Sequence, residues 1–229
     1  MKLNIITRFN LKWKKIESYN QWLTDRVLLF ERYLAKSLSK QVDKNFKLVL
    51  MIDQNTNKDI ISKLNNIFLE NEIEAELLLC RNIKDSKDKI ESKYKSKKVI
   101  LSRIDSDDAV SENYVKNIRL FFSDEKNHDK ILDFKSLYYF DTKTKETIEV
   151  FYPRPSMFLS MLSNVTTPYA NSHDRVDIAT KRKVFKSSNK DVCCICHGGN
   201  ISNNVNKSKS RFKYLKSNKK IEDWLWVKK

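Results

Sequence analysis

Short apolar runs alternate with amphipathic helical segments along the first half of this chain. The runs are rich in Val, Ile, Leu and Phe, which predicts strands over 3–7, 46–52, 75–80 and 99–104. The spacing of apolar residues predicts helices over 23–38, 60–68 and 112–122, and 85–98 is a charged, helix-compatible connection. Strands that alternate with helices of this length form βαβ units. The sequence therefore predicts an α/β fold, with a mostly parallel sheet flanked by helices.

The predicted strands carry polar side chains at their ends. Thr7 and Arg8 end the first strand, Asp53 follows the second, and Asp105 and Asp107 follow the fourth. In open α/β sheets, ligands bind at the carboxyl ends of the strands. We therefore expect these side chains to converge at one edge of the sheet, although they are far apart in the sequence.

The densest charge in the chain follows the strand predicted over 99–104. Asp105, Asp107 and Asp108 lie within four positions, shortly after Arg103. Carboxylates this close raise one another's pKa unless a metal ion or an arginine neutralises them. Mg²⁺ and Mn²⁺ prefer oxygen ligands of this kind. The alternative is a solvated acidic turn that caps the next helix, and a motif this short does not separate the two.

The second half of the chain is richer in predicted strands. Two β-prone runs at 131–140 and 147–152 flank a polar stretch, which predicts a hairpin. After two prolines, 156–162 is predicted to be a short apolar helix, 171–175 a polar loop, and 192–197 a late strand. We therefore expect a second, smaller and β-rich part.

The C-terminal segment differs from both parts. Residues 200–220 are polar and rich in lysine, which predicts a mobile basic arm. Residues 221–227 are apolar and contain Trp224 and Trp226, so we expect them to dock on the protein or to contact a membrane surface.

Glycine is scarce, and its placement is informative. The chain has two glycines, Gly198 and Gly199, which are adjacent and follow His197. Glycine is required where the backbone takes a positive φ or approaches another group closely, so we expect such a need here. The same scarcity excludes a P-loop and a GxGxxG dinucleotide motif.

The charge balance favours anionic partners without choosing among them. Lys and Arg total 45 against 29 Asp and Glu, which gives a net charge of +16. Such an excess suits nucleic acid, anionic lipid or phosphate-bearing substrates. Much of it lies in polar segments at 84–98, 181–190 and 207–220, where a solvated lysine-rich surface explains most of the excess.

Two further features bear on location. No apolar stretch reaches 18 residues, and charge appears too early in the chain for a signal peptide. Of the four cysteines, three lie at 193, 194 and 196, which suggests reduced thiols in a chain without a secretory signal. We therefore expect a cytoplasmic protein, with peripheral contact to an anionic membrane left open.

Five segments resemble, in order, the GT-A-fold nucleotide-sugar glycosyltransferases and among them a rhamnosyltransferase-like family. They are Ile6–Asn10, Gln41–Asp53, Arg103–Ala109 (Arg-Ile-Asp-Ser-Asp-Asp-Ala), Tyr152–Ser160 and His197–Asn200. The resemblance implies a GT-A-like, Rossmann-like domain over 1–200. Its nucleotide-sugar-binding half would be 1–125 and its acceptor half 126–200, followed by the basic arm and terminal apolar segment at 201–229.

The resemblance also implies an activity and a cofactor. A sugar, rhamnose by the family's label, would move from a nucleoside-diphosphate donor to a hydroxyl of a glycan or polysaccharide acceptor. Asp105-Ser106-Asp107 would be the DXD motif, whose carboxylates hold a Mn²⁺ or Mg²⁺ that bridges the donor's two phosphates. Asp107 would bind the metal directly, Asp105 would contact the ribose or a metal-bound water, and His197 would complete the metal shell.

The remaining site residues follow from the same resemblance. Thr7, Arg8 and Asp53 would line the nucleotide pocket together with Ser106 of the motif. Arg103 would support the diphosphate or orient the acidic loop. Asp174 is a candidate catalytic base in the acceptor half if the enzyme inverts configuration. The alternative is that Asp174 pairs with Arg175 or caps a helix, and a retaining enzyme needs no such base.

Two other functions remain open at this point. One is a metal-dependent phosphoryl-transfer enzyme, such as a nuclease or nucleotidyltransferase, that uses Asp105, Asp107 and Asp108 on nucleic acid. The other is a non-catalytic module whose lysine-rich arm binds nucleic acid or an anionic membrane.

Overall fold

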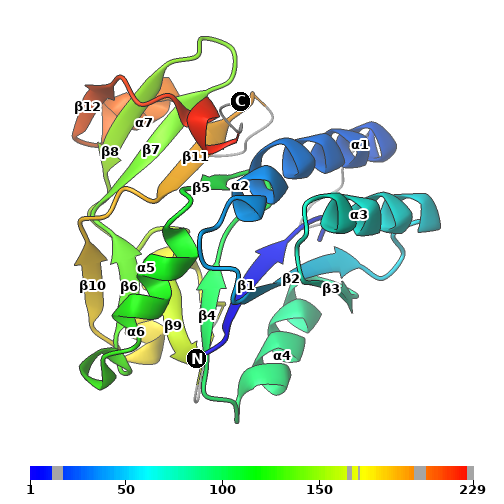
Figure 1. Ribbon diagram of the computed structural model, residues 1–229, viewed down its shortest axis with the longest axis horizontal. Coiled ribbons are helices and arrows are strands. Elements are labelled where there is room, and N and C mark those ends of the chain that lie inside the picture. Colours follow the sequence, from blue (N-terminus) through cyan, green and yellow to red (C-terminus); the bar gives the residue numbers. More distant parts are fainter. Residues whose placement is uncertain (12–17, 164–166, 170, 199–204, 226–229) are drawn as a thin grey trace.

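Two β-sheets with flanking helices make up the computed structural model of the chain (Figure 1). The structure describes residues 1–229 except 12–17, 164–166, 170, 199–204 and 226–229, and for Asp174 and Lys207 it describes the backbone alone. The mixed α/β class that the sequence predicts is confirmed.

Seven strands form the first sheet, in the order β10-β6-β9-β4-β1-β2-β3. They are β1 (Leu3–Arg8), β2 (Phe46–Asp53), β3 (Ala75–Cys80), β4 (Val99–Arg103), β6 (Ile131–Phe134), β9 (Ser160–Ser163) and β10 (Val184–Ser187). Pairing within β3-β2-β1-β4 is parallel, and so is the pairing of β10 with β6. Strand β9 is antiparallel to both of its neighbours. The four predicted strands and their mostly parallel arrangement are therefore confirmed.

Helices cover both faces of this sheet. Alternate side chains of each strand point to opposite faces, so neighbouring residues of one strand pack against different helices. Ile5 packs in one apolar cluster with residues of α1, α3 and α5, whereas Ile6 packs in another with residues of α4. The helices are α1 (Tyr19–Leu29), the π-helix η1 (Phe30–Ala35), α2 (Lys36–Ser39), α3 (Lys58–Glu70), α4 (Ile83–Tyr94) and α5 (Tyr114–Phe121). Short helical turns elsewhere are η2 (Glu125–Asn127), η3 (His173–Arg175) and α6 (Val176–Thr180).

Five strands form the second sheet, in the order β12-β8-β7-β11-β5. They are β5 (Ala109–Val110), β7 (Ser136–Asp141), β8 (Thr147–Phe151), β11 (Val192–Cys196) and β12 (Tyr214–Ser217). The predicted hairpin is the β7–β8 pair. The single run predicted at 131–140 divides at the exposed Lys135, so that its first part joins the first sheet and its second part joins the second.

Two predictions about the second half are wrong. The apolar residues at 156–162 do not form a helix, because Ser160–Ser163 fill the space between β4 and β6 as strand β9, with every side chain buried. The basic segment is not a mobile arm over its described part: α7 (Val205–Arg211) precedes β12, which hydrogen-bonds along β8. An open strand edge on β8 supplies the hydrogen-bond partners that a lysine-rich segment lacks by itself.

The last described turn docks on the second sheet, as the sequence predicts. Helix η4 (Ile221–Trp224) buries Trp224, whose ring centroid lies 5.8 Å from that of Tyr138 on β7. Trp226 lies outside the described residues. Within the described chain, no helix combines the length and apolar character that crossing a membrane requires.

Candidate functional site

The acidic segment connects the two sheets. Strand β4 of the first sheet ends at Arg103 and β5 of the second begins at Ala109, so residues 104–108 cross between them (Figure 1). Strand β11 pairs antiparallel with β5, with Cys193 opposite Ala109, and then continues alongside the acidic loop. This register carries the chain after β11 to the acidic loop.

His197 and Asp107 meet at that point. The Nε2 atom of His197 lies 3.0 Å from Oδ2 of Asp107, and the two side chains are 14% and 15% exposed. Burial opposes ionisation of Asp107, but the hydrogen bond to His197 and the charge of Arg26 outweigh it and hold the pKa of Asp107 below its usual value. The pair therefore presents an ionised carboxylate and an imidazole that solvent reaches.

Asp108 has a different environment from Asp107. It is 1% exposed, its Oδ1 accepts a hydrogen bond from the backbone N–H of Ile195 at 3.0 Å, and its Oδ2 has no hydrogen-bond partner among the described residues. Burial and the charges of Asp107 and Asp105 raise the pKa of Asp108 well above its usual value. Asp108 thus ties the loop to β11, and its environment differs from that of the neighbouring Asp107.

The helical segment from α1 to α2 holds the acidic loop from the other side. Nη2 of Arg26 donates a hydrogen bond to Oγ of Ser106 at 2.5 Å, and Oγ of Ser37 accepts one from the backbone N–H of Val110 at 3.3 Å. Arg26 is a residue that the sequence analysis missed. The sequence does mark this position, because an arginine three residues after Leu23 falls on the apolar face of the predicted helix, where a charged side chain is unexpected.

The ends of β1 and β2 are tied together beside Asp53. The Oδ1 atom of Asn10 accepts a hydrogen bond from the backbone N–H of Asp53 at 2.9 Å, and its Nδ2 donates to Thr56 Oγ1 at 2.9 Å and to the Tyr19 hydroxyl at 3.2 Å. One carboxylate oxygen of Asp53 accepts the backbone N–H of Asn55 at 2.8 Å. Asp53 thus lies at the predicted edge of the sheet, with Asn10 and Tyr19 beside it.

Arg8 and Arg103 end neighbouring strands and share a contact with Tyr169. Their guanidinium carbons lie 4.4 Å and 4.7 Å from the centroid of the Tyr169 ring. The charge of Asp105 acts on Arg8 and on Tyr169 as well as on Asp108. Thr7 is fully buried, and its hydroxyl has no hydrogen-bond partner among the described residues. Tyr169 had no sequence signal, because it lies in an irregular segment without periodicity.

Two predicted features fall partly outside the described structure. The backbone of Asp174 lies in η3, but its side chain is not described. Gly198 has a φ of +82°, so the expected positive φ is found immediately after His197. Gly199 lies outside the described residues.

Asp107 and His197 supply only part of the ligand set that a divalent ion needs. Among the described residues, no group of three or more His, Cys, Asp or Glu side chains is arranged to hold a metal. An ionised carboxylate oxygen and an imidazole nitrogen are nevertheless donors that Mn²⁺ accepts. Mg²⁺ usually keeps several bound waters and binds through one or two carboxylates together with phosphates of the substrate. The Asp107–His197 pair is therefore suited to a metal ion that the phosphates of a bound substrate also help to hold.

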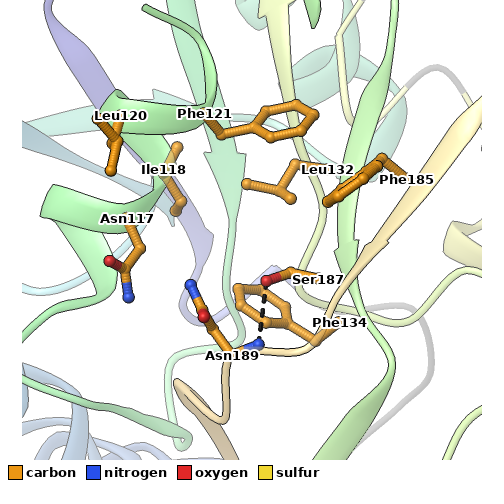
Figure 2. A pocket seen from close by; sticks show the side chains of 9 residues that line it. All are labelled: Asn117, Ile118, Leu120, Phe121, Leu132, Phe134, Phe185, Ser187 and Asn189. Atoms are coloured by element: carbon orange, nitrogen blue, oxygen red, sulfur yellow. Dashed lines mark hydrogen bonds between the residues drawn. The ribbon is translucent and has the colours of Figure 1, made fainter.

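A cavity of about 220 Å³ lies elsewhere in the molecule. Residues on or beside helix α5 and strands β6 and β10 line it, with Phe121, Leu132 and Phe185 at one end and Asn117 and Asn189 at the other (Figure 2). None of the predicted site residues lines this cavity.

Comparison with known proteins gives one family and one fold. The family model described as "Putative rhamnosyl transferase" matches residues 13–208. No curated protein sequence matches the chain. A crystal structure of S. aureus TarS 1–349 matches with a TM-score of 0.51 and 14% identity, over 85% of this chain and 60% of that one. A second crystal structure of S. aureus TarS matches with a TM-score of 0.48 and 13% identity, over 85% of this chain and 37% of that one. The chain thus spans 60% of the first TarS chain, and at this identity the first likeness shows the fold alone.

Proposed function

Because the chain belongs to the family described as "Putative rhamnosyl transferase", we propose that it transfers a sugar from a nucleoside-diphosphate donor to an acceptor hydroxyl with the help of a divalent metal ion. The 3.0 Å contact between Asp107 and His197 is the observation that carries this proposal. Rhamnose is the sugar that the family's name suggests, and a glycan is the acceptor that fits a transferase of this kind.

The topology supports a GT-A-like arrangement. The strand order β3-β2-β1-β4, all parallel, is that of one half of a doubly wound nucleotide-binding sheet. Ligands of such sheets lie outside the carboxyl ends of the strands, at the point where the strand order reverses. That point is the boundary between β1 and β4, where Arg8 and Arg103 lie. We assign the nucleotide-sugar half to residues 1–125 and the acceptor half to 126–200.

Each residue of the site then has a proposed task. Asp107 and His197 would hold Mn²⁺ or Mg²⁺, which as a Lewis acid stabilises the charge on the departing nucleoside diphosphate. Arg26 holds Ser106 and so orients the loop that carries Asp107. Arg8 and Arg103 would bring positive charge toward the diphosphate, and Asp105, whose charge acts on Arg8, would contact the ribose or a metal-bound water. Thr7 and Asp53, at the ends of β1 and β2, would contact the nucleoside.

Asp174 remains our candidate for the base that deprotonates the acceptor hydroxyl. It lies in the acceptor half, in the turn η3, which follows β9 in the chain. An inverting enzyme needs a base on the acceptor side, whereas a retaining enzyme does not.

Phosphoryl transfer on nucleic acid is the weaker candidate. That chemistry would use Asp105, Asp107 and Asp108 as one cluster of ionised carboxylates. Asp108 is buried, its Oδ1 accepts the Ile195 N–H, and its pKa is raised, so it is a poor metal ligand. The geometry therefore favours the glycosyltransferase.

The basic C-terminal segment suggests where this enzyme works. Residues 205–220 include seven Lys or Arg and no Asp or Glu. Strand β12 lies at the edge of the second sheet with Tyr214 and Leu215 exposed beside Lys216. Lysines interleaved with exposed apolar side chains suit the surface of an anionic bilayer. We propose that this segment makes peripheral contact with such a membrane.

A donor screen tests the proposed activity. The full chain is incubated with nucleotide sugars that carry UDP, GDP or dTDP, in Mn²⁺, in Mg²⁺ and in EDTA, and release of the nucleoside diphosphate is measured. We expect one donor to be consumed only when a divalent ion is present. No consumption of any donor, together with no thermal stabilisation by any nucleoside diphosphate, would contradict the proposal, because a ligand that binds the folded state raises its melting temperature.

A further inference from the structure

Two arginines from neighbouring strands pack against one buried tyrosine. The hydroxyl of Tyr169 donates a hydrogen bond to the backbone oxygen of Ile6 at 3.1 Å. Ile6 lies opposite Arg103 in the register of β1 with β4, and Arg8 is two residues further along the same face of β1. The ring lies beside both guanidinium groups, whose central carbons are 4.4 Å and 4.7 Å from its centroid.

The surrounding residues do not neutralise these two charges. In the part of the chain that the structure describes, neither Arg8 nor Arg103 forms an ion pair, and both Nε atoms are buried without an acceptor. Arg103 is only 9% exposed. The charge of Asp105 acts on Arg8 without an ion pair, and the charge of Arg103 opposes it.

An anion bound between Arg8 and Arg103 would compensate their charges. A buried charge is unfavourable unless another charge or hydrogen bonds compensate it. The electron-rich face of the Tyr169 ring attracts both cations and thereby offsets part of their mutual repulsion, but an aromatic ring accepts no conventional hydrogen bond from the remaining N–H groups. The planar N–H groups of arginine match the oxygens of phosphate groups in pairs.

We propose that Tyr169 is a positioning residue that holds Arg8 and Arg103 together as a diphosphate-binding subsite, distinct from the Asp107–His197 pair. The identity of the anion as the donor's diphosphate rests on the proposed function. The subsite itself rests on the geometry of the two arginines and the ring. Because these cations belong to the protein, the chain binds a diphosphate even when no metal ion is present.

Calorimetric titration of the full chain with inorganic pyrophosphate, in EDTA and at low salt, tests this inference. Tyr169→Phe keeps the ring and loses the hydroxyl, whereas Tyr169→Leu removes the ring. Tyr94→Leu is the matched control, because Tyr94 is 4% exposed and packs in the same apolar cluster as Tyr169, with its hydroxyl 3.3 Å from Asn4. The Tyr94 ring lies near the ammonium groups of Lys93 and Lys97, whereas the Tyr169 ring lies between two arginines.

We expect the wild type and Tyr94→Leu to bind pyrophosphate equally, and Tyr169→Phe to stay within a few-fold of them. Tyr169→Leu should weaken binding by about tenfold or more. The proposal is overturned if the wild type does not bind pyrophosphate in EDTA, or if folded Tyr169→Leu binds it like the wild type. Should Tyr169→Leu fail to fold, Arg8→Gln takes its place, with the same tenfold loss expected and unchanged binding as the contrary result.

The kinetics separate this inference from the proposed function. Once a donor is known, Tyr169→Leu should raise the KM for that donor more than it lowers kcat, since the ring acts only through the arginines. Pyrophosphate binding without turnover of any donor would count against the enzyme and leave the subsite standing. Turnover of a donor with KM unchanged in Tyr169→Leu would count against the subsite and leave the enzyme standing.

Discussion

Oδ2 of Asp107 lies 3.0 Å from Nε2 of His197, although 90 positions separate the two residues in the chain. The antiparallel pairing of β11 with β5 produces this contact, because it aligns the end of β11 with the acidic loop. The Asp107–His197 pair thus depends on both sheets at once: β4 leads into the loop that carries Asp107, and β11 leads to His197.

Replacing Asp107 by Asn should remove most of the sugar transfer. The amide keeps the shape of the side chain but lacks the negative charge that holds a divalent ion, and metal catalysis contributes several kcal/mol to the stabilisation of a transition state. We expect the release of nucleoside diphosphate to fall by about 100-fold or more. Asp124→Asn, at an exposed carboxylate in the loop after α5, is the control. An Asp107→Asn protein with full turnover would show that Asp107 holds no essential ion.

Asp108→Asn should make stability less sensitive to rising pH. The raised pKa of Asp108 means that the folded state holds this proton more tightly than the unfolded state does. The contribution of Asp108 to the free energy of unfolding therefore falls as pH rises above the unfolded-state value. Asn keeps the acceptor for the Ile195 N–H and has no proton to lose. Urea unfolding at pH 5 and pH 8 should show the variant gaining stability relative to the wild type at the higher pH, and a difference independent of pH would contradict the assignment.

Arg26→Met should impair catalysis more than folding. The substitution removes the hydrogen bond to Ser106 and the positive charge beside Asp107, but it keeps an unbranched apolar side chain in the helix. A hydrogen bond that involves a charged group contributes about 1.5–3 kcal/mol, so a loss of turnover of about tenfold or more is expected. Arg32→Met is the control, because Arg32 lies in the adjoining π-helix and its guanidinium group lies over the ring of Tyr33. Equal turnover in the two variants would remove Arg26 from the site.

Neutralising the basic C-terminal surface should release the protein from anionic vesicles. Arg211, Lys216 and Lys220 are exposed, and each cation near an anionic membrane contributes about 1 kcal/mol. Changing all three to Gln should weaken binding to vesicles of phosphatidylcholine with phosphatidylglycerol by about 100-fold. The matched control changes Lys84, Lys95 and Lys98 to Gln, three exposed lysines on or beside α4. Equal losses in the two triple variants would indicate a nonspecific effect of net charge, and binding to oligonucleotide in preference to vesicles would identify a different partner.

Local patterns in the sequence were sufficient for the four parallel strands β1 to β4 of the first sheet. Strands β1 and β4 and helix α1 are all present where the sequence predicts a strand, a strand and a helix. The reason is that the pattern of apolar residues in each element reflects which of its faces are buried. The same rule failed at Ser160–Ser163. A short apolar run fits either a helix or a buried strand, and only the space between β4 and β6 decides between them. The basic segment was misjudged for a related reason, since β12 depends on the open edge of β8.

For the candidate site as well, the sequence predicts some features and only the tertiary structure shows the others. Composition and order along the chain are enough to place Arg8, Asp53 and Asp105 at strand ends, since a parallel sheet brings such ends to one edge. They do not reveal that the pKa is lowered at Asp107 and raised at Asp108, because the two residues are neighbours in sequence and differ only in what surrounds them. Nor do they reveal Tyr169, whose role depends on contacts with residues more than 60 positions away. Periodicity and strand ends are properties of the sequence, whereas burial, pKa shifts and long-range contacts arise only when the chain folds and distant segments pack together.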